Sequence, residues 1–175
     1  MEKKKTSREY LELSALELLT EWPINKVTVE DIVQNCSISK RTFYNYFRDK
    51  NELVSQTYIH LLEKYFEQRE ISLSGFIRFF VQISFENRQF LRNAIIYTEQ
   101  NNICDSLYEP VGDQLFRASN VESKNSFGER EKLAATFVAY GMVAFLADTA
   151  SHGYNYTPEE MISFFENGIP KVLKR

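Results

Sequence analysis

Apolar residues recur at intervals of three and four along almost the whole chain, and no sustained alternation of apolar and polar residues replaces that spacing. Such intervals place side chains on one face of a helix, whereas a half-buried strand would alternate. The pattern therefore predicts an all-α fold, with helices beginning near residues 7, 28, 40, 50, 75, 88, 104, 129 and 158. The helix that begins at residue 50 is expected to continue to about residue 69.

Polar residues mark where several of these helices start. Three capping boxes precede helices, each a threonine followed three residues later by an acidic residue: Thr6 with Glu9, Thr28 with Asp31, and Thr157 with Glu160. Ser74 and Asn87 are predicted to cap two helices in the middle of the chain, and Pro110 is predicted to interrupt the helix over 104–118. Trp22, at the end of the first helix, is expected to pack against the two helices that follow.

The stretch over 28–52 organises the chain, because it contains two short helices joined by a tight polar turn at 36–38. Ser39 is expected to cap the second helix, in which Phe43 and Phe47 lie four apart and face inward. This arrangement predicts a helix-turn-helix. Its outward side chains and its helix starts supply the candidate DNA-binding residues: Thr28, Ser39, Lys40, Arg41, Thr42, Tyr44, Asn45, Tyr46 and Lys50.

These residue types suit nucleic acid. Arginine and lysine hydrogen-bond guanine edges or phosphates, asparagine reads adenine, and threonine contacts the thymine methyl group. Tyrosine hydroxyls suit phosphate oxygens, and Lys50 lies in the first turn of its helix, where the dipole already favours an anion. The alternative is a helical hairpin with a solvated charged face, but two tyrosines and an asparagine are unusual on such a face.

The segment TVEDIV followed by SISKRTFYNYFRDKNEL resembles the DNA-binding segment of the TetR/AcrR family of bacterial transcriptional regulators. The specific part is Ser-x-x-Thr-Phe-Tyr-x-Tyr-Phe-x-x-Lys-x-x-Leu, from Ser39 to Leu53. The family usually has glycine where this chain has Ser37, and serine carries mild strain at a positive φ, so we expect a slightly different turn rather than a lost one. A looser likeness relates YGMVAFLAD…YTPEE to the short C-terminal domains of Firmicutes members.

The resemblance implies a homodimeric regulator, with repression as the expected output, that binds an inverted-repeat DNA operator. Residues 1–53 would form the helix-turn-helix domain, and residues 54–175 a helical ligand-sensing and dimerisation domain. The last two helices carry more apolar surface than a hairpin needs, which agrees with dimerisation there. The alternative is that this surplus packs only on the protein's own core. The predicted dimer residues are Phe137, Gly141, Ala144, Phe145, Met161, Phe164 and Phe165.

An effector pocket is expected in the aromatic-rich interior, because twelve of the fourteen phenylalanines lie beyond residue 54. The candidate lining residues are Phe79, Phe80, Tyr97, Phe116, Phe137, Tyr140 and His152. A stripe of aromatics at helical spacing also forms an ordinary core, so both interpretations stay open. An apolar or aromatic small molecule fits these stripes best. Control by a protein co-regulator instead of a small ligand is the second hypothesis.

Charge and composition restrict the functions that this protein can have. The net charge is −3, and residues 1–53 hold nine basic and nine acidic residues, but residues 36–50 hold four basic residues against one acid. A local patch of this kind suffices for specific DNA binding. The two cysteines and two histidines form no metal-spaced cluster, so neither an enzyme nor a cofactor is expected. No leader pattern or transmembrane run is evident, which predicts a cytoplasmic protein without membrane contact.

Overall fold

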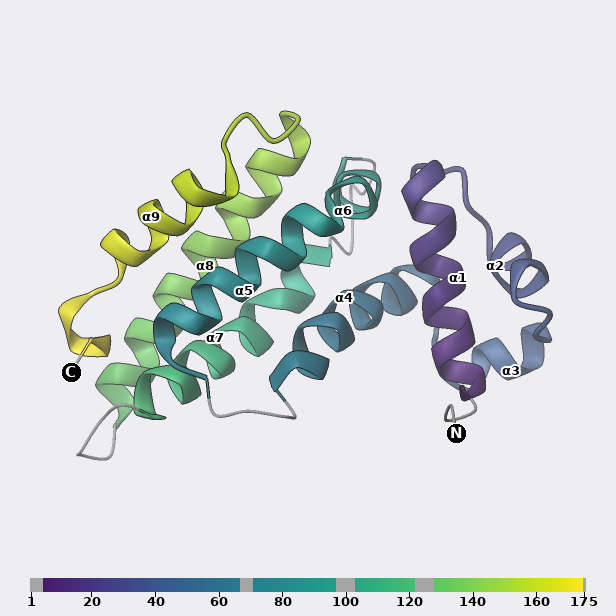
Figure 1. The fold of residues 1–175 in the computed structure, drawn as a ribbon. Coiled ribbons are helices and arrows are strands. Elements are labelled where there is room, and N and C mark those ends of the chain that lie inside the picture. The colour runs from purple at the N-terminus through teal and green to yellow at the C-terminus, as the bar shows by residue number, and fades with distance from the viewer. Residues whose placement is uncertain (1–4, 67–70, 97–102, 122–127, 175) are drawn as a thin grey trace.

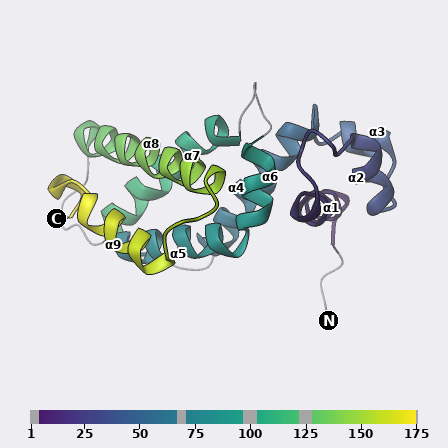
Figure 2. The ribbon, with the colours of Figure 1, turned by 90° about the horizontal axis from the view of Figure 1, so that it is seen from above.

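The computed structural model describes residues 5–66, 71–96, 103–121 and 128–174, and the prediction of an all-α fold is confirmed for those ranges. The helices are α1 (Ser7–Glu21), α2 (Val29–Asn35), α3 (Lys40–Tyr44), α4 (Lys50–Phe66), α5 (Leu73–Glu86), α6 (Arg88–Ile95), α7 (Ile103–Val121), α8 (Glu129–Ser151), α9 (Pro158–Gly168) and a short 3-10 helix (Lys171–Leu173). Helices α1–α3 form one end of the molecule and α5–α9 the other, with α4 running from one to the other (Figures 1 and 2). We call α1–α3 the reading head.

The predicted helix starts are confirmed at all three capping boxes, where each threonine accepts a bond from the backbone N–H three residues on and the acidic side chain bonds back. Two predictions need correction. Ser72, not Ser74, caps α5, because the Ser72 hydroxyl accepts from the Gly75 N–H at 3.1 Å while Ser74 donates to Glu166. Asn87 precedes α6 as predicted, but its side chain makes no bond at the start of α6 and donates instead to the Ile83 carbonyl at the end of α5.

Two local predictions were wrong because helical packing overrode them. Helix α7 continues through Pro110. A helical proline leaves the carbonyl four residues earlier without its donor, and that residue, Ser106, is exposed to solvent. Trp22 is 60% exposed, so most of its side chain faces solvent, while Ile24 and Val27 of the same loop are each only 3% exposed and belong to the core.

The C-terminal bundle is held together by close packing of α7 against α8. A side-chain atom added at Gly112 of α7 would lie 3.5 Å from the Thr136 Cα and 3.6 Å from the Ala139 Cβ, so these helices approach closely. Ala135 and Ala139 are fully buried at this contact. Helix α8 is long and apolar enough to cross a membrane by length and composition alone, yet one side of it is covered by α6 and α7. Its other side remains exposed.

Helix α4 joins the two ends of the molecule physically, because it contacts α1 on one side and α5 and α7 on the other. Tyr58 is fully buried in its middle, and the Tyr58 hydroxyl lies 2.8 Å from the Ser84 hydroxyl of α5. Burial raises the pKa of Tyr58, so this bond persists at any physiological pH. The predicted domain border at residues 53 and 54 therefore falls inside one continuous helix.

Candidate nucleic-acid interface

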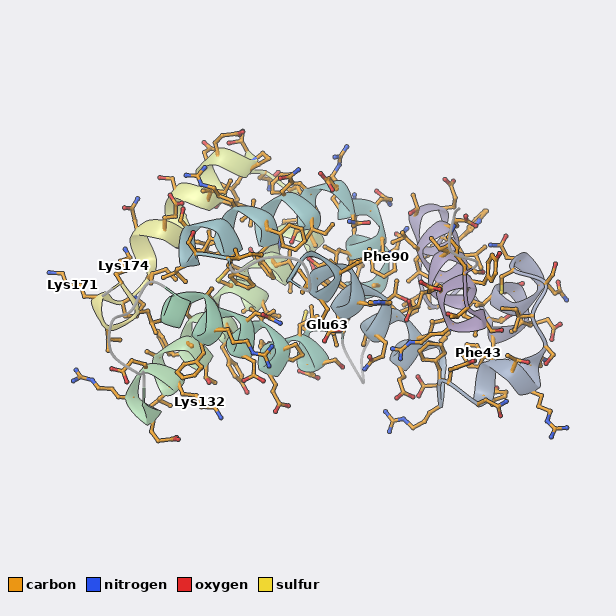
Figure 3. The ribbon with its side chains drawn as sticks, turned by 60° about the horizontal axis from the view of Figure 1, so that its bottom comes forward. Phe43, Glu63, Phe90, Lys132, Lys171 and Lys174 are labelled. Carbon is orange, nitrogen blue, oxygen red and sulfur yellow. The ribbon has the colours of Figure 1, made fainter. Side chains whose placement is uncertain are left out.

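The helix-turn-helix forms as predicted, but α3 ends at Tyr44, so Phe47 lies beyond the helix in which the spacing placed it. Ser39 caps α3, with its hydroxyl accepting from the Thr42 N–H at 3.1 Å. Phe43 is fully buried and Phe47 is 2% exposed, and their ring centroids lie 5.8 Å apart in the core of the reading head. Figure 3 shows Phe43 inside the head, while Lys132, Lys171 and Lys174 lie at the opposite end of the molecule. These two phenylalanines fix which face of α3 is left outward.

The turn between α2 and α3 tolerates serine at the glycine position. Ser37 has a φ of 55°, so the chain enters the left-handed region there. The turn is nevertheless closed by backbone bonds from Ser37 N–H to the Gln34 carbonyl (3.2 Å) and from Ile38 N–H to the Val33 carbonyl (2.9 Å). The expected strain is therefore present and the turn is kept.

The predicted DNA-binding residues surround one exposed tip of the head. Tyr44 is 58% and Tyr46 is 47% exposed, and Lys40, Arg41 and Asn45 are exposed beside them. This combination of cations, an amide and phenol groups is what base edges and phosphates require.

The three predicted hydroxyl residues hold the helix starts. Thr42 is only half-buried, and its hydroxyl lies 2.9 Å from that of Ser39. The Thr28 hydroxyl donates to Asp31 at 2.6 Å. These side chains shape the helix ends, where backbone N–H groups also attract anions.

Lys40 is paired within the head before any DNA arrives. Its ammonium lies 2.5 Å from the Glu30 carboxylate of α2, and both side chains are exposed. The hydrogen bond from Lys40 lowers the pKa of Glu30, and Glu30 in turn raises the pKa of Lys40. Both groups are therefore charged at neutral pH, and Glu30 places a negative charge at the surface that would face DNA.

Lys50 is placed differently from the other predicted DNA-binding residues. Its ammonium donates to the carbonyls of Ile24 (2.7 Å) and Val27 (2.6 Å), in the loop between α1 and α2. Burial lowers the pKa of Lys50, and the carbonyls satisfy two of its three donors. The sequence suggested a phosphate contact because it shows only the position at a helix start. The two acceptors lie more than twenty residues upstream, where no sequence spacing reveals them.

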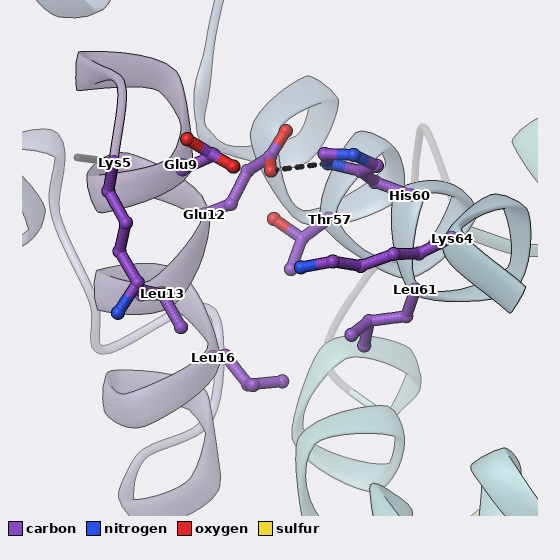
Figure 4. Close-up of a pocket in the computed structure, with 9 residues that line it drawn as sticks. All are labelled: Lys5, Glu9, Glu12, Leu13, Leu16, Thr57, His60, Leu61 and Lys64. Atoms are coloured by element: carbon purple, nitrogen blue, oxygen red, sulfur yellow. Dashed lines mark hydrogen bonds and ion pairs between the residues drawn. The ribbon is translucent and has the colours of Figure 1, made fainter. Parts of the chain in front are cut away.

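A polar contact joins α1 to α4 and was missed by sequence reasoning (Figure 4). The Glu12 side chain is 8% exposed and receives the Arg8 Nε at 2.9 Å and the His60 Nδ1 at 2.7 Å. Glu12 and His60 also border a cleft of about 90 Å³ between the two helices, with Leu16 and Leu61 on its apolar side. The pairing supports the head against α4, and no sequence signal marks it because Glu12 and His60 lie 48 residues apart.

The predicted effector-pocket residues that the structure describes differ widely in burial. Phe80 is fully buried in the core, Phe79 and Phe116 are half-buried, and Phe137 and Tyr140 are 75% and 52% exposed. His152 is exposed, and Tyr97 lies outside the described residues. Helical spacing groups aromatic residues on one face of a helix but does not say whether that face turns inward, so the assignment of these residues to a pocket stays a prediction.

A different cavity opens between α4, α5 and α7. It measures about 220 Å³, and its floor is apolar, formed by Ile59, Leu62, Phe76 and Val111. Its rim carries charged and polar side chains: Glu63, Glu109, Asp113, Gln114 and Arg117. No sequence spacing predicts this cavity, because its walls come from three separate helices.

An exposed apolar surface covers α8 and α9, and we call it the α8–α9 face. Its most exposed members are Leu133 (71%), Phe137 (75%), Tyr140 (52%), Tyr156 (49%) and Phe164 (60%).

The other predicted dimer residues divide into two groups. Gly141 and Ala144 are exposed and Phe145 is half-buried, in agreement with a surface. Met161 (1%) and Phe165 (6%) are buried within the protomer, so they support the α8–α9 face from below and do not form part of it.

Among the described residues no group of three or more His, Cys, Asp or Glu side chains could hold a metal ion. Cys104 is buried, and burial raises the pKa of its thiol to about 11, which keeps it protonated and unreactive at neutral pH.

The profile for "Bacterial regulatory proteins, tetR family" matches residues 14–57, and the profile for "Transcriptional regulator C-terminal region" matches residues 70–171. No curated protein matches the chain.

Several solved structures share the fold. "Dihydroxyacetone kinase operon activator DhaS" is 18% identical, with a TM-score of 0.68 over 95% of this chain and 96% of that one. A TetR transcriptional regulator from Rhodococcus sp. RHA1 is 12% identical, with a TM-score of 0.70 over 97% and 98%. The TetR family repressor AlkX from Dietzia sp. strain DQ12-45-1b, implicated in biodegradation of n-alkanes, is 17% identical, with a TM-score of 0.62 over 98% of each chain. With a matched helix-turn-helix and a matched C-terminal region on one all-α chain, this protein belongs to the TetR family of DNA-binding bacterial transcriptional regulators.

Proposed function

We propose that the protein is a cytoplasmic homodimer that binds an inverted-repeat operator, represses transcription from it, and loses operator affinity when a small molecule binds the C-terminal domain. The observation that carries this proposal is the exposed tip of the head, where Arg41, Tyr44 and Tyr46 surround a helix held in place by buried Phe43 and Phe47. A helix presented in this way enters the major groove with its outward side chains at the base edges.

The α8–α9 face supports the dimer. Apolar side chains that are half to three-quarters exposed are costly in a monomer, and a two-fold axis lets one such face cover its own copy. The two heads would then contact successive major grooves about 34–36 Å apart, or a multiple of that distance.

The cavity between α4, α5 and α7 is the proposed effector site, because one of its walls is the helix that continues into the head. Its apolar floor suits an apolar or aromatic group. A ligand that binds one position of α4 more tightly than another would favour that position and so change the distance between the two heads. A coupling free energy of about 1–3 kcal/mol between ligand binding and DNA binding is typical of such switches.

Control by a protein partner is the second candidate, and the size of the cavity favours it. Pockets for drug-sized ligands measure roughly 300–1,000 Å³, whereas this one measures about 220 Å³. Structures with the same fold include one titled an operon activator and one titled a repressor, so the direction of control does not follow from the fold.

The test is binding of the purified protein to DNA upstream of its own gene, with salt titrated and Tyr44→Ala compared. Tight, salt-sensitive binding that weakens in the variant is expected, since Tyr44 is assigned to a phosphate. Binding that is unaffected by Tyr44→Ala would contradict the assigned face. An effector screen on the same operator then separates the two modes of control, because only a small-molecule switch releases DNA without added protein.

A further inference from the structure

The end of α1 is held by α6 through a buried asparagine. Asn93 is 7% exposed, and its side-chain nitrogen donates to the Leu19 carbonyl in the last turn of α1 at 2.7 Å. The backbone carbonyl of Asn93 accepts the Ile24 N–H at 3.0 Å. One residue of the C-terminal domain therefore bonds the reading head at two points, and Figure 1 shows α6 beside the end of α1 where this occurs.

The other backbone group of Ile24 is held from α4. Its carbonyl accepts the Lys50 ammonium at 2.7 Å, and the same ammonium reaches the Val27 carbonyl at 2.6 Å. Ile24 is itself 3% exposed. Its N–H is therefore bonded by the backbone of α6 and its carbonyl by α4, and we call the group formed by Asn93, Leu19, Ile24 and Lys50 the Ile24 lock.

We propose that the Ile24 lock is a positioning device: it fixes the angle of the reading head on the C-terminal domain, and so the distance between the two heads of the dimer. Asn93 and Lys50 are its positioning residues. The inference rests on the proposed function, since it assumes that two heads read one operator.

Hydrogen bonds fix the orientation of two helices in a way that apolar contacts do not. The apolar part of the contact between α1 and α4 resists separation but allows sliding, because the hydrophobic effect has no preferred orientation. The Glu12–His60 pair joins the same two helices, but the His60 side chain is 35% exposed, so water weakens that bond. Hydrogen bonds in a buried setting are strong and depend on angle, so they select one orientation. The lock places such bonds at the two helices, α4 and α6, that connect the head to the rest of the protein.

The same geometry indicates that the Lys50 ammonium binds carbonyl groups of the protein and not a DNA phosphate. Two carbonyls already receive its ammonium, and its side chain is half-buried. A phosphate contact would reduce the slope of log affinity against log salt by about one when the charge is removed, whereas a positioning role leaves that slope unchanged.

The experiment uses the full-length dimer and an operator selected by the wild type. Its spacer is then changed by one base pair in either direction, which rotates one half-site against the other by about a tenth of a turn. Asn93→Ala and Lys50→Met are compared with the wild type on every spacer and on a single half-site. Asn87→Ala and Lys64→Met are the matched controls: the Asn87 side chain donates to Ile83 of α5 and does not reach the head, and Lys64 is exposed on α4.

We expect the wild type to prefer its own spacer by at least about fivefold, as a coupling of this class allows. Asn93→Ala and Lys50→Met should each lower that preference to less than about half of the wild-type ratio. The affinity for a single half-site and the salt slope should stay unchanged. Lys50→Arg, which keeps the donors, should restore the preference, and both control variants should match the wild type.

Several outcomes would overturn the lock. An unchanged spacer preference in both variants would refute the positioning role of the Ile24 lock. Equal losses on the half-site and on all spacers, with a lower melting temperature, would reduce Asn93 to a structural role. A salt slope lowered by about one in Lys50→Met would return Lys50 to the phosphate backbone. A wild type that binds no DNA would instead overturn the proposed function, and the lock with it.

Discussion

Two surfaces of this protein expose aromatic side chains, and they differ in what lies between the rings. On the tip of the reading head, Tyr44 and Tyr46 are separated by Asn45 and flanked by Lys40 and Arg41.

On the α8–α9 face the rings follow one another with small residues between them. Phe137 and Tyr140 are followed by Gly141 and Ala144, and the Tyr140 ring stacks on Tyr108 with centroids 4.1 Å apart. The two surfaces expose similar residues in very different chemical settings.

The difference indicates different partners. Phenol groups among cations suit phosphates and base edges, because each ring also offers a hydroxyl and the charges attract the DNA backbone. Rings among small apolar residues offer no such attraction, and they gain free energy only when another apolar surface removes them from water. Exposure shows only that a side chain is not covered within the protomer. The residues that lie between the rings indicate what kind of partner would cover them.

The largest expected effect comes from a substitution that disrupts the α8–α9 face. Phe137→Glu should convert the dimer to monomers by sedimentation, because a two-fold interface buries the new charge twice. Operator affinity should fall by at least about 100-fold, since the second head no longer binds at high effective concentration. Phe137 is 75% exposed, so the protomer should melt as the wild type does. Lys171→Glu adds acidity at another exposed site as the control, and a Phe137→Glu dimer would refute the interface.

The next effect sharpens the role of the head. Arg41→Ala should cost roughly 1–3 kcal/mol at one base position and relax specificity there, because an arginine at a base edge discriminates by its paired donors. The dimer should remain intact. Binding to a library of operator variants measures the change position by position. A loss that is uniform over all sequences would move Arg41 to the phosphate backbone.

A smaller effect concerns the stability of the head. Ser37→Gly should raise the free energy of unfolding by up to about 1 kcal/mol, because Ser37 sits at a φ of 55° that glycine adopts without strain. Thermal melting measures the gain. Ser39→Gly is the control, since the same change two residues later removes a cap at an ordinary φ of −76°. A destabilised Ser37→Gly variant would show that the turn is not strained.

The smallest effect tests the charge balance on the head. Glu30→Gln releases Lys40 and removes a negative charge from the DNA-facing side, so operator affinity should rise by about two- to threefold, as expected for an exposed pair. The gain should shrink as salt is raised. Glu21→Gln, at the far end of α1, should change nothing. Weaker binding by Glu30→Gln would mean that the pair orients Lys40 for DNA.

The sequence determined what depends on neighbours along the chain. Capping boxes at Thr6, Thr28 and Thr157 act over three residues, so their helices start where predicted. The inward direction of Phe43 and Phe47 follows from their four-residue spacing, although only Phe43 belongs to the short helix α3. Local chemistry and local geometry coincide there.

Tertiary structure decided everything that depends on which face of a helix meets another helix. Trp22 turns to solvent while Ile24 and Val27 of the same loop are buried, and Met161 is buried while Phe164 on the same helix is exposed. The acceptors of Lys50 come from a distant loop. Helical periodicity specifies a stripe of apolar residues but not its direction, because burial is set by packing between segments far apart in the chain.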